Sequence, residues 1–140
     1  MIAHLLTVMK PPSRVDDSGK APGSAILPVL QEHFAALDRE ELVVAGFDRG
    51  LRLLSYVHGT GHAFSIEGGM AIVRQALAPQ RLSFLLLAHN HPCGSPLPSE
   101  ADLAMTRRVV ALARLAGVAV SDHLIFAGAR VVSFRALGLL

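Results

Sequence analysis

Residues 82–102 read LSFLLLAHNHPCGSPLPSEAD, and this stretch joins a hydrophobic run to a group of polar residues. The run 82–88 is almost wholly apolar, which is typical of a strand buried on both faces of a sheet. It ends in His89 and His91, one residue apart, and a Pro- and Gly-rich loop then leads to Asp102. A connecting loop needs turn-forming residues. It does not need a second histidine at this spacing.

The two histidines are placed to act together. Side chains alternate between the faces of a strand, so His89 and His91 should present both imidazoles on one side. A catalytic zinc site typically has three protein ligands and one water. Asp102 lies at the start of the next predicted helix, and loop 92–98 can fold that helix start back over the strand end. These three residues predict an open tetrahedral zinc site with about one ion per chain.

Each part of this pattern also has a simpler structural interpretation. Two histidines in a loop are commonly ordinary polar residues. Ser99, followed three residues later by Asp102 and preceded by Pro98, matches the start of a capped helix. For Ser99 and Asp102 taken alone, capping is the favoured interpretation. The complete spacing His-x-His-x7-Ser-x2-Asp is longer and more specific than either simple interpretation explains.

The rest of the chain predicts a mixed sheet with helices packed on it. Apolar spacing and turn signals indicate helices over 24–37, 67–78 and 99–116 and strands over 41–48, 51–58, 82–88, 118–126 and 131–134. Arg49-Gly50 is expected to form a two-residue hairpin turn. Residues 1–23, which include a segment rich in Pro, Gly, Ser and charged residues, are expected to form a flexible arm before one domain over 24–140.

Composition narrows the class of protein. Hydrophobic residues make up 51% of the chain, enough for a sizeable core, and no apolar run is long enough to cross a membrane. The single cysteine, Cys93, excludes an internal disulfide and fits a reducing compartment, so a cytoplasmic location is expected. The net charge of +2 with scattered basic residues only weakly supports nucleic-acid binding.

The segment from His89 to Gly94, continued by Pro98, Ser99 and Asp102, resembles the JAMM/MPN metalloprotease motif and most closely the RadC-type JAB domains of bacteria. The resemblance extends over about residues 24–137. It implies a three-layer α/β/α sandwich with a mixed sheet, similar to cytidine deaminase. It also implies a zinc ion bound by two histidines and an aspartate, a glutamate that acts on the zinc-bound water, and a serine that stabilises the oxyanion.

Transferred to this chain, the resemblance implies the zinc ligands His89, His91 and Asp102 and the oxyanion serine Ser99. The glutamate could be Glu40 or Glu41. Strand alternation puts these two on opposite faces, so only one can reach the metal. Matching Asp38-Arg39-Glu40 to the opening of the family's domain favours Glu40, and for both glutamates the simpler interpretation is a solvated strand entrance.

These features together predict a zinc-dependent metallopeptidase or isopeptidase, whose substrate is a peptide or protein, ubiquitin-like conjugates included. The alternative is a non-catalytic JAB-fold interaction module associated with DNA repair or mobile elements. Longer RadC proteins carry an N-terminal helix-hairpin-helix region. Only a short arm precedes the domain in this sequence, which weakens the family's case for DNA binding.

Five further residues receive weaker predictions. Asp122 could orient a zinc-ligating imidazole from outside the ligand shell, with His123 beside it, or the two could form a locally hydrogen-bonded pair. Cys93 stands where the family usually has serine and is expected to be an inert small residue rather than a ligand. His58 could line the substrate groove, but an ordinary loop residue is the favoured interpretation, and His33 carries no recognisable signal.

Overall fold

The computed structural model describes residues 26–60 and 66–140. The predicted flexible arm, residues 1–23, lies outside the described residues. Three helices and five strands follow one another as α1 (Leu27–Ala35), β1 (Glu41–Phe47), β2 (Leu53–Thr60), α2 (Ile66–Ala76), β3 (Phe84–Asn90), α3 (Glu100–Leu115), β4 (Ala119–Ala127) and β5 (Arg130–Ser133). Every helix and strand predicted from the sequence is present, with bounds shifted by a few residues.

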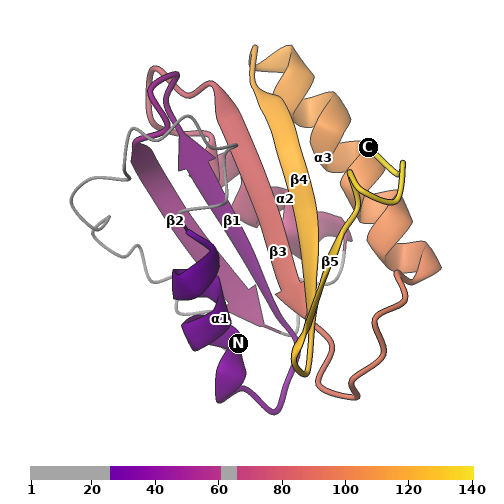
Figure 1. Cartoon of the computed structure of the whole chain (residues 1–140). Helices are drawn as coiled ribbons and strands as arrows, with labels where there is room; N and C mark the ends of the chain where they lie inside the picture. The colour runs from indigo at the N-terminus through magenta and orange to yellow at the C-terminus, as the bar shows by residue number, and fades with distance from the viewer. Residues whose placement is uncertain (1–25, 61–65) are drawn as a thin grey trace, which may run out of the picture.

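The five strands form one mixed sheet in the order β2-β1-β3-β4-β5. Strand β3 runs parallel to β4, and the other neighbouring pairs are antiparallel. Helix α1 covers one face of this sheet, while α2 and α3 lie together behind the other face (Figure 1). The predicted three-layer α/β/α sandwich is therefore confirmed.

Strand β3 is central because its side chains are apolar toward both layers. Leu85 and Leu87 pack in the core beneath α2 and α3, whereas Leu86 and Ala88 pack in the core beneath α1. Residues from Leu85 to Asn90 are all buried. The near-continuous apolar run thus marks a two-sided buried strand, as the sequence predicted.

The connection between β1 and β2 differs from the predicted two-residue turn. Strand β1 ends at Phe47 and β2 begins at Leu53, so five residues separate them. The Asp48 carboxylate accepts a hydrogen bond from the Arg52 amide at 2.8 Å. Leu51 takes a left-handed conformation with φ of 64°. The prediction was wrong because a left-handed leucine leaves no residue-type signal, whereas Arg49-Gly50 suggested a tight turn.

Gly46 is the position where β1 can carry no side chain. A Cβ there would lie 2.3 Å from the Ser55 hydroxyl oxygen, which donates a hydrogen bond to the Ala76 carbonyl, and 2.7 Å from a Leu82 methyl. We therefore expect Gly46→Ala to lower the free energy of unfolding by about 1–3 kcal/mol, the usual cost of overpacking. Urea unfolding followed by circular dichroism would measure this. Gly50→Ala is the control, because the nearest atom to a Cβ there is 3.5 Å away. Equal stability of the two variants would contradict the prediction.

Among the described residues, no helix combines the length and the apolar character that crossing a bilayer requires.

Candidate metal centre

The carboxyl end of β3 and the first turn of α3 bring His89, His91 and Asp102 together. The Nε2 atoms of the two histidines are 2.9 Å apart. Asp102 places Oδ1 3.3 Å from His89 Nε2 and Oδ2 3.3 Å from His91 Nε2. The three side chains converge although the loop between strand and helix separates them in sequence, as the spacing predicted.

Two backbone hydrogen bonds and one glycine shape the loop between β3 and α3. The His91 amide donates to the Phe126 carbonyl of β4 at 2.8 Å, which extends the parallel pairing one residue past β3. The Gly94 amide donates to the His91 carbonyl, and Gly94 has φ of 81°, a conformation that glycine adopts without strain. This turn reverses the chain toward the start of α3.

Ser99 and Asp102 form a complete capping box at the start of α3. The Ser99 hydroxyl accepts from the Asp102 amide at 3.1 Å, and Asp102 Oδ2 accepts from the Ser99 amide at 2.8 Å. The capping interpretation is therefore confirmed. It is compatible with metal binding, because the same carboxylate also faces both imidazoles. The cap fixes the rotamer of Asp102 and so holds its oxygens toward the histidines.

A chain of hydrogen bonds assigns the protons on His89. The Thr106 hydroxyl donates to the Asp102 carbonyl at 2.7 Å, so its oxygen accepts from His123 Nδ1, 2.6 Å away. His123 Nε2 then carries the lone pair and accepts from His89 Nδ1 at 2.7 Å. His89 consequently has its proton on Nδ1 and a lone pair on Nε2, the atom that faces Asp102.

His91 also has its proton on Nδ1, and a single hydrogen bond shows this. Its Nδ1 lies 2.8 Å from the Ser95 carbonyl oxygen, which can only accept, so Nδ1 carries the proton. The Nε2 atoms of both histidines therefore direct lone pairs at one another and at a carboxylate. Such an arrangement is unfavourable without a positive charge between the groups, and a divalent cation or a shared proton would supply it. The donor set fits a zinc ion.

Burial and charge affect the ionisation of this group. Burial acts to raise the pKa of Asp102. In the metal-free site a proton shared with His89 gives that ring a positive charge and a hydrogen bond to Asp102, and these, with the bonds from Ser99, outweigh burial and hold the pKa of Asp102 well below its usual range. Burial, followed by repulsion from His89, lowers the pKa of His123 well below its ordinary value. His123 is thus neutral at neutral pH, as the chain of hydrogen bonds requires, and Asp102 is ionised.

Glu40 and Ser99 line the same cavity as the two histidines and Asp102. The cavity has a volume of about 280 Å³ and lies over the carboxyl end of β3. Leu42, two residues after Glu40, packs beneath α2 and α3, whereas Val43 packs on the opposite side of the sheet. Glu40 therefore shares the face of the histidines, and Glu41 belongs to the α1 face.

Asp122 and His123, both predicted to lie beside the metal ligands, have different partners. His123 contacts His89 directly and is stacked against Phe134, with ring centroids 4.3 Å apart. Asp122 instead accepts hydrogen bonds from groups near the end of β5. One of its oxygens accepts from the His123 and Arg135 amides, and the other accepts from the Ser133 hydroxyl. Of the two residues, His123 is the one that contacts His89, because both Asp122 oxygens are engaged in local bonds.

Thr106 was not predicted as a site residue, although it holds His123. Its only signal in the sequence is its position four residues after Asp102, which places both on one side of a helix. Cys93 is exposed and lines the cavity. It is not among the three residues whose ligand atoms converge.

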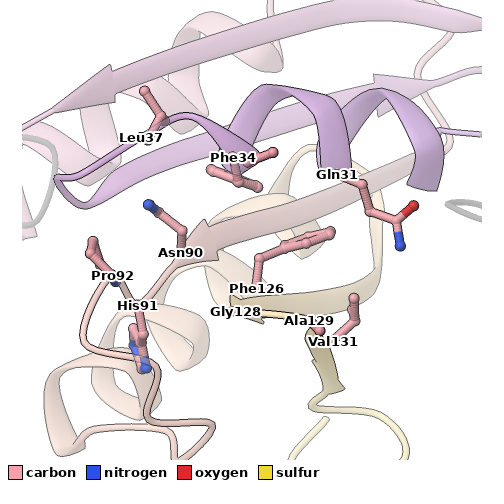
Figure 2. Close-up of a pocket in the computed structure, with 11 residues that line it drawn as sticks. Gln31, Phe34, Leu37, Asn90, His91, Pro92, Phe126, Gly128, Ala129 and Val131 are labelled. Carbon is pink, nitrogen blue, oxygen red and sulfur yellow. The ribbon is translucent and has the colours of Figure 1, made fainter.

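A second cavity of about 440 Å³ lies on the α1 side of the sheet, between α1 and the ends of β3, β4 and β5 (Figure 2). Its apolar lining includes Phe34, Leu37 and Phe126. Asn90 points toward α1, and the His91 ring points away from it, as strand alternation requires (Figure 2). His91 contributes to the lining of both cavities.

Comparison with known proteins bears on this site. The sequence profile of the family described as RadC-like JAB domain matches residues 21–139. Over 114 residues the chain is 37% identical to UPF0758 protein YkfG of Escherichia coli K12, covering 79% of this chain and 71% of that protein. A UPF0758 protein of Rhodobacter capsulatus is 36% identical over 113 residues, which cover 81% of this chain but 49% of the relative. The E. coli K12 protein YfjY is 36% identical over 115 residues, covering 79% of this chain and 70% of YfjY.

Proposed function

The chain belongs to the RadC-like JAB domain family, and from this premise we propose that it is a zinc-dependent hydrolase of amide bonds, a metallopeptidase or isopeptidase. The names of its relatives specify no reaction or substrate, and some relatives extend well beyond the matched region. The proposal therefore depends on the geometry of the candidate metal centre.

One observation carries the proposal. Two imidazole lone pairs and a carboxylate converge, with the ring protons held elsewhere by His123 and the Ser95 carbonyl. Three such ligands leave a coordination position for water in a catalytic zinc site. A bound zinc ion would lower the pKa of a coordinated water and polarise the carbonyl of a substrate. A purely structural zinc site would instead be closed by a fourth protein ligand.

The residues around the metal centre supply the other functions that hydrolysis needs. Glu40, in the same cavity, would accept a proton from the attacking water and deliver it to the leaving amine. The Ser99 hydroxyl would donate a hydrogen bond to the oxyanion of the tetrahedral intermediate. A polypeptide substrate leaving this cavity would pass His91 and enter the second cavity beneath α1. We therefore propose a peptide or protein substrate, ubiquitin-like conjugates included.

The proposal is tested by measuring whether hydrolysis of amide bonds depends on bound metal. Purified protein is stripped with a chelator, divided, and reloaded with zinc or left metal-free. Each sample is then incubated with a peptide library and with ubiquitin-like proteins joined through isopeptide bonds. We expect cleavage by the zinc-loaded protein and none by the metal-free protein, with products identified by mass spectrometry. Absence of cleavage of any substrate by fully zinc-loaded protein would contradict the enzyme and favour a non-catalytic interaction module.

A further inference from the structure

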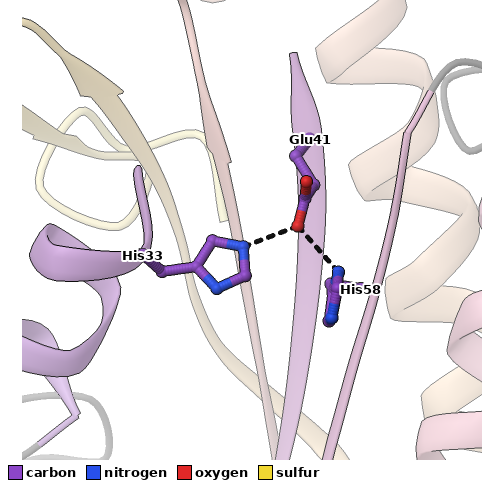
Figure 3. A group of neighbouring side chains, drawn as sticks. All are labelled: His33, Glu41 and His58. Carbon is purple, nitrogen blue, oxygen red and sulfur yellow. Dashed lines mark hydrogen bonds and ion pairs between the residues drawn. The ribbon is translucent and has the colours of Figure 1, made fainter. Parts of the chain in front are cut away.

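A second group of potential metal ligands lies on the α1 face of the sheet. It consists of His33 from α1, Glu41 from β1 and His58 from β2, and we call it the His33 cluster (Figure 3). Glu41 Oε1 is 2.6 Å from His33 Nε2 and 2.7 Å from His58 Nδ1. Both imidazoles thus contact the same carboxylate oxygen.

The carboxylate of this cluster is unusually well buried. The Glu41 side chain is 5% exposed, while those of His33 and His58 are 15% and 20% exposed. A buried carboxylate is costly unless hydrogen bonds and a positive charge compensate it. The two imidazoles can provide this compensation with their protons, or they can share a cation with the carboxylate. The partial exposure of both imidazoles means that the cluster is not wholly sealed from solvent.

Tyr56 supports a metal-binding form of His33. Its hydroxyl lies 3.0 Å from His33 Nδ1. Burial, and next the charge of Glu41, raise the pKa of Tyr56 to about 12, so the hydroxyl stays protonated and can either donate or accept. When it accepts from Nδ1, the lone pair of His33 lies on Nε2, facing Glu41. Metal-bound histidines are commonly oriented through their second ring nitrogen in this way.

We propose that His33, Glu41 and His58 form a second binding site for a divalent transition-metal ion of the zinc class. Two imidazole nitrogens and one carboxylate oxygen are a ligand set that zinc uses, whereas calcium and magnesium favour sites built from oxygen. This site is separate from the candidate metal centre, because strand alternation puts Glu41 and Glu40 on opposite faces of the sheet.

Metal binding requires a small rearrangement of the His33 cluster. Bonds of about 2.0–2.1 Å in a tetrahedral arrangement separate ligand atoms by about 3.3 Å, so each imidazole must move away from Glu41 by roughly 0.6 Å. Both imidazoles are partly exposed and can make this shift. The proton of each ring moves to its other nitrogen: from Nε2 to Nδ1 in His33, where Tyr56 accepts it, and from Nδ1 to Nε2 in His58.

Occupation of the site would fix the start of β1. The ion would join α1, β1 and β2 at Glu41, whose amide also donates to the Asn90 side chain at 2.8 Å. The Asn90 side-chain amide in turn donates to the Arg39 carbonyl at 2.9 Å. Asn90 lies between His89 and His91, and Glu40 lies between Arg39 and Glu41. The second ion would therefore hold in register the two segments that carry Glu40 and the two histidines.

The test is metal stoichiometry, measured by elemental analysis after zinc loading and removal of unbound ion. We expect two zinc ions in the wild-type chain, one in Glu41→Gln, one in His58→Gln and one in Asp102→Asn. Glutamine at position 41 keeps the shape of the side chain and still accepts hydrogen bonds from both imidazoles. Circular dichroism of each variant checks the fold, and His58→Gln provides a second variant at a more exposed position.

The outcomes separate the two sites. One zinc in the wild type that is lost in Asp102→Asn and kept in Glu41→Gln and His58→Gln overturns the second site and leaves the proposed function standing. One zinc that is kept in Asp102→Asn and lost in Glu41→Gln supports the His33 cluster and overturns the zinc centre of the proposed function. Two zinc ions in every variant overturn the assignment of both sites.

Discussion

Glu40→Gln is expected to reduce hydrolysis by about 10²–10⁴-fold while leaving the zinc content at the wild-type level. Glutamine keeps the size of the side chain and can hydrogen-bond a water molecule, but it cannot accept the proton. Three other side chains converge as ligands, so Glu40 is not needed to hold the ion. The measurement is initial rate on a substrate cleaved by the wild type, with elemental analysis of the same preparation.

A matched substitution separates loss of the base from loss of a negative charge. Glu100 is exposed in the first turn of α3 and does not line the cavity, so Glu100→Gln should keep nearly the wild-type rate. If Glu40→Gln were as active as Glu100→Gln, Glu40 would not be the base. If Glu41→Gln alone were inactive with both zinc ions present, the assignment of the two glutamates to their faces would be wrong.

Two features of the candidate metal centre were predictable because they depend on local sequence. The apolar run 82–88 identified the central strand, and alternation along it put His89 and His91 on one face. The capping pattern at Ser99 fixed where α3 begins, and hence where Asp102 stands. Short-range rules sufficed because one strand, one loop and one helix start contain all three side chains.

The His33 cluster could not be predicted in the same way. His33 was interpreted as carrying no signal and His58 as a loop residue, yet both contact Glu41. Their meeting depends on how α1 packs on the sheet and on the register of β1 with β2, in which Val43 pairs with His58. Neither the helix packing nor the register leaves a local pattern. The same reason explains Thr106, whose role depends on the position of His123 in a different element.

The different partners of Asp122 and His123 also depend on how β4 pairs with β3. His123 pairs with Leu87 of β3, so its ring lies next to that of His89 in the layer beneath α3. Asp122, one residue earlier, accepts hydrogen bonds from the Ser133 hydroxyl and the Arg135 amide of the following segment. Adjacent residues in a strand face opposite sides, and only one of this pair could reach the metal centre.

Asp102→Asn is expected to remove the zinc ion of the candidate metal centre while leaving the cap of α3 intact. The asparagine oxygen can still accept from the Ser99 amide, as the Asp102 carboxylate does at 2.8 Å. It lacks the negative charge that stands opposite both imidazoles. Loss of an outer-shell partner usually costs about 10–100-fold in metal affinity, so loss of this direct ligand should cost about 100-fold or more. Zinc titration against a competing chelator would measure the affinity.

Ser99→Ala is the complementary substitution, because it removes the cap and keeps the ligand. We expect it to lower the free energy of unfolding by about 1 kcal/mol, the usual cost of losing a serine cap. Zinc affinity should change far less than in Asp102→Asn, since the Ser99 hydroxyl contacts the Asp102 amide rather than the carboxylate. Hydrolysis should nevertheless fall by about 10²–10³-fold if the hydroxyl stabilises the oxyanion. Zinc lost in Ser99→Ala but kept in Asp102→Asn would mean that Asp102 matters only as a cap, and the metal centre would then need a different third ligand.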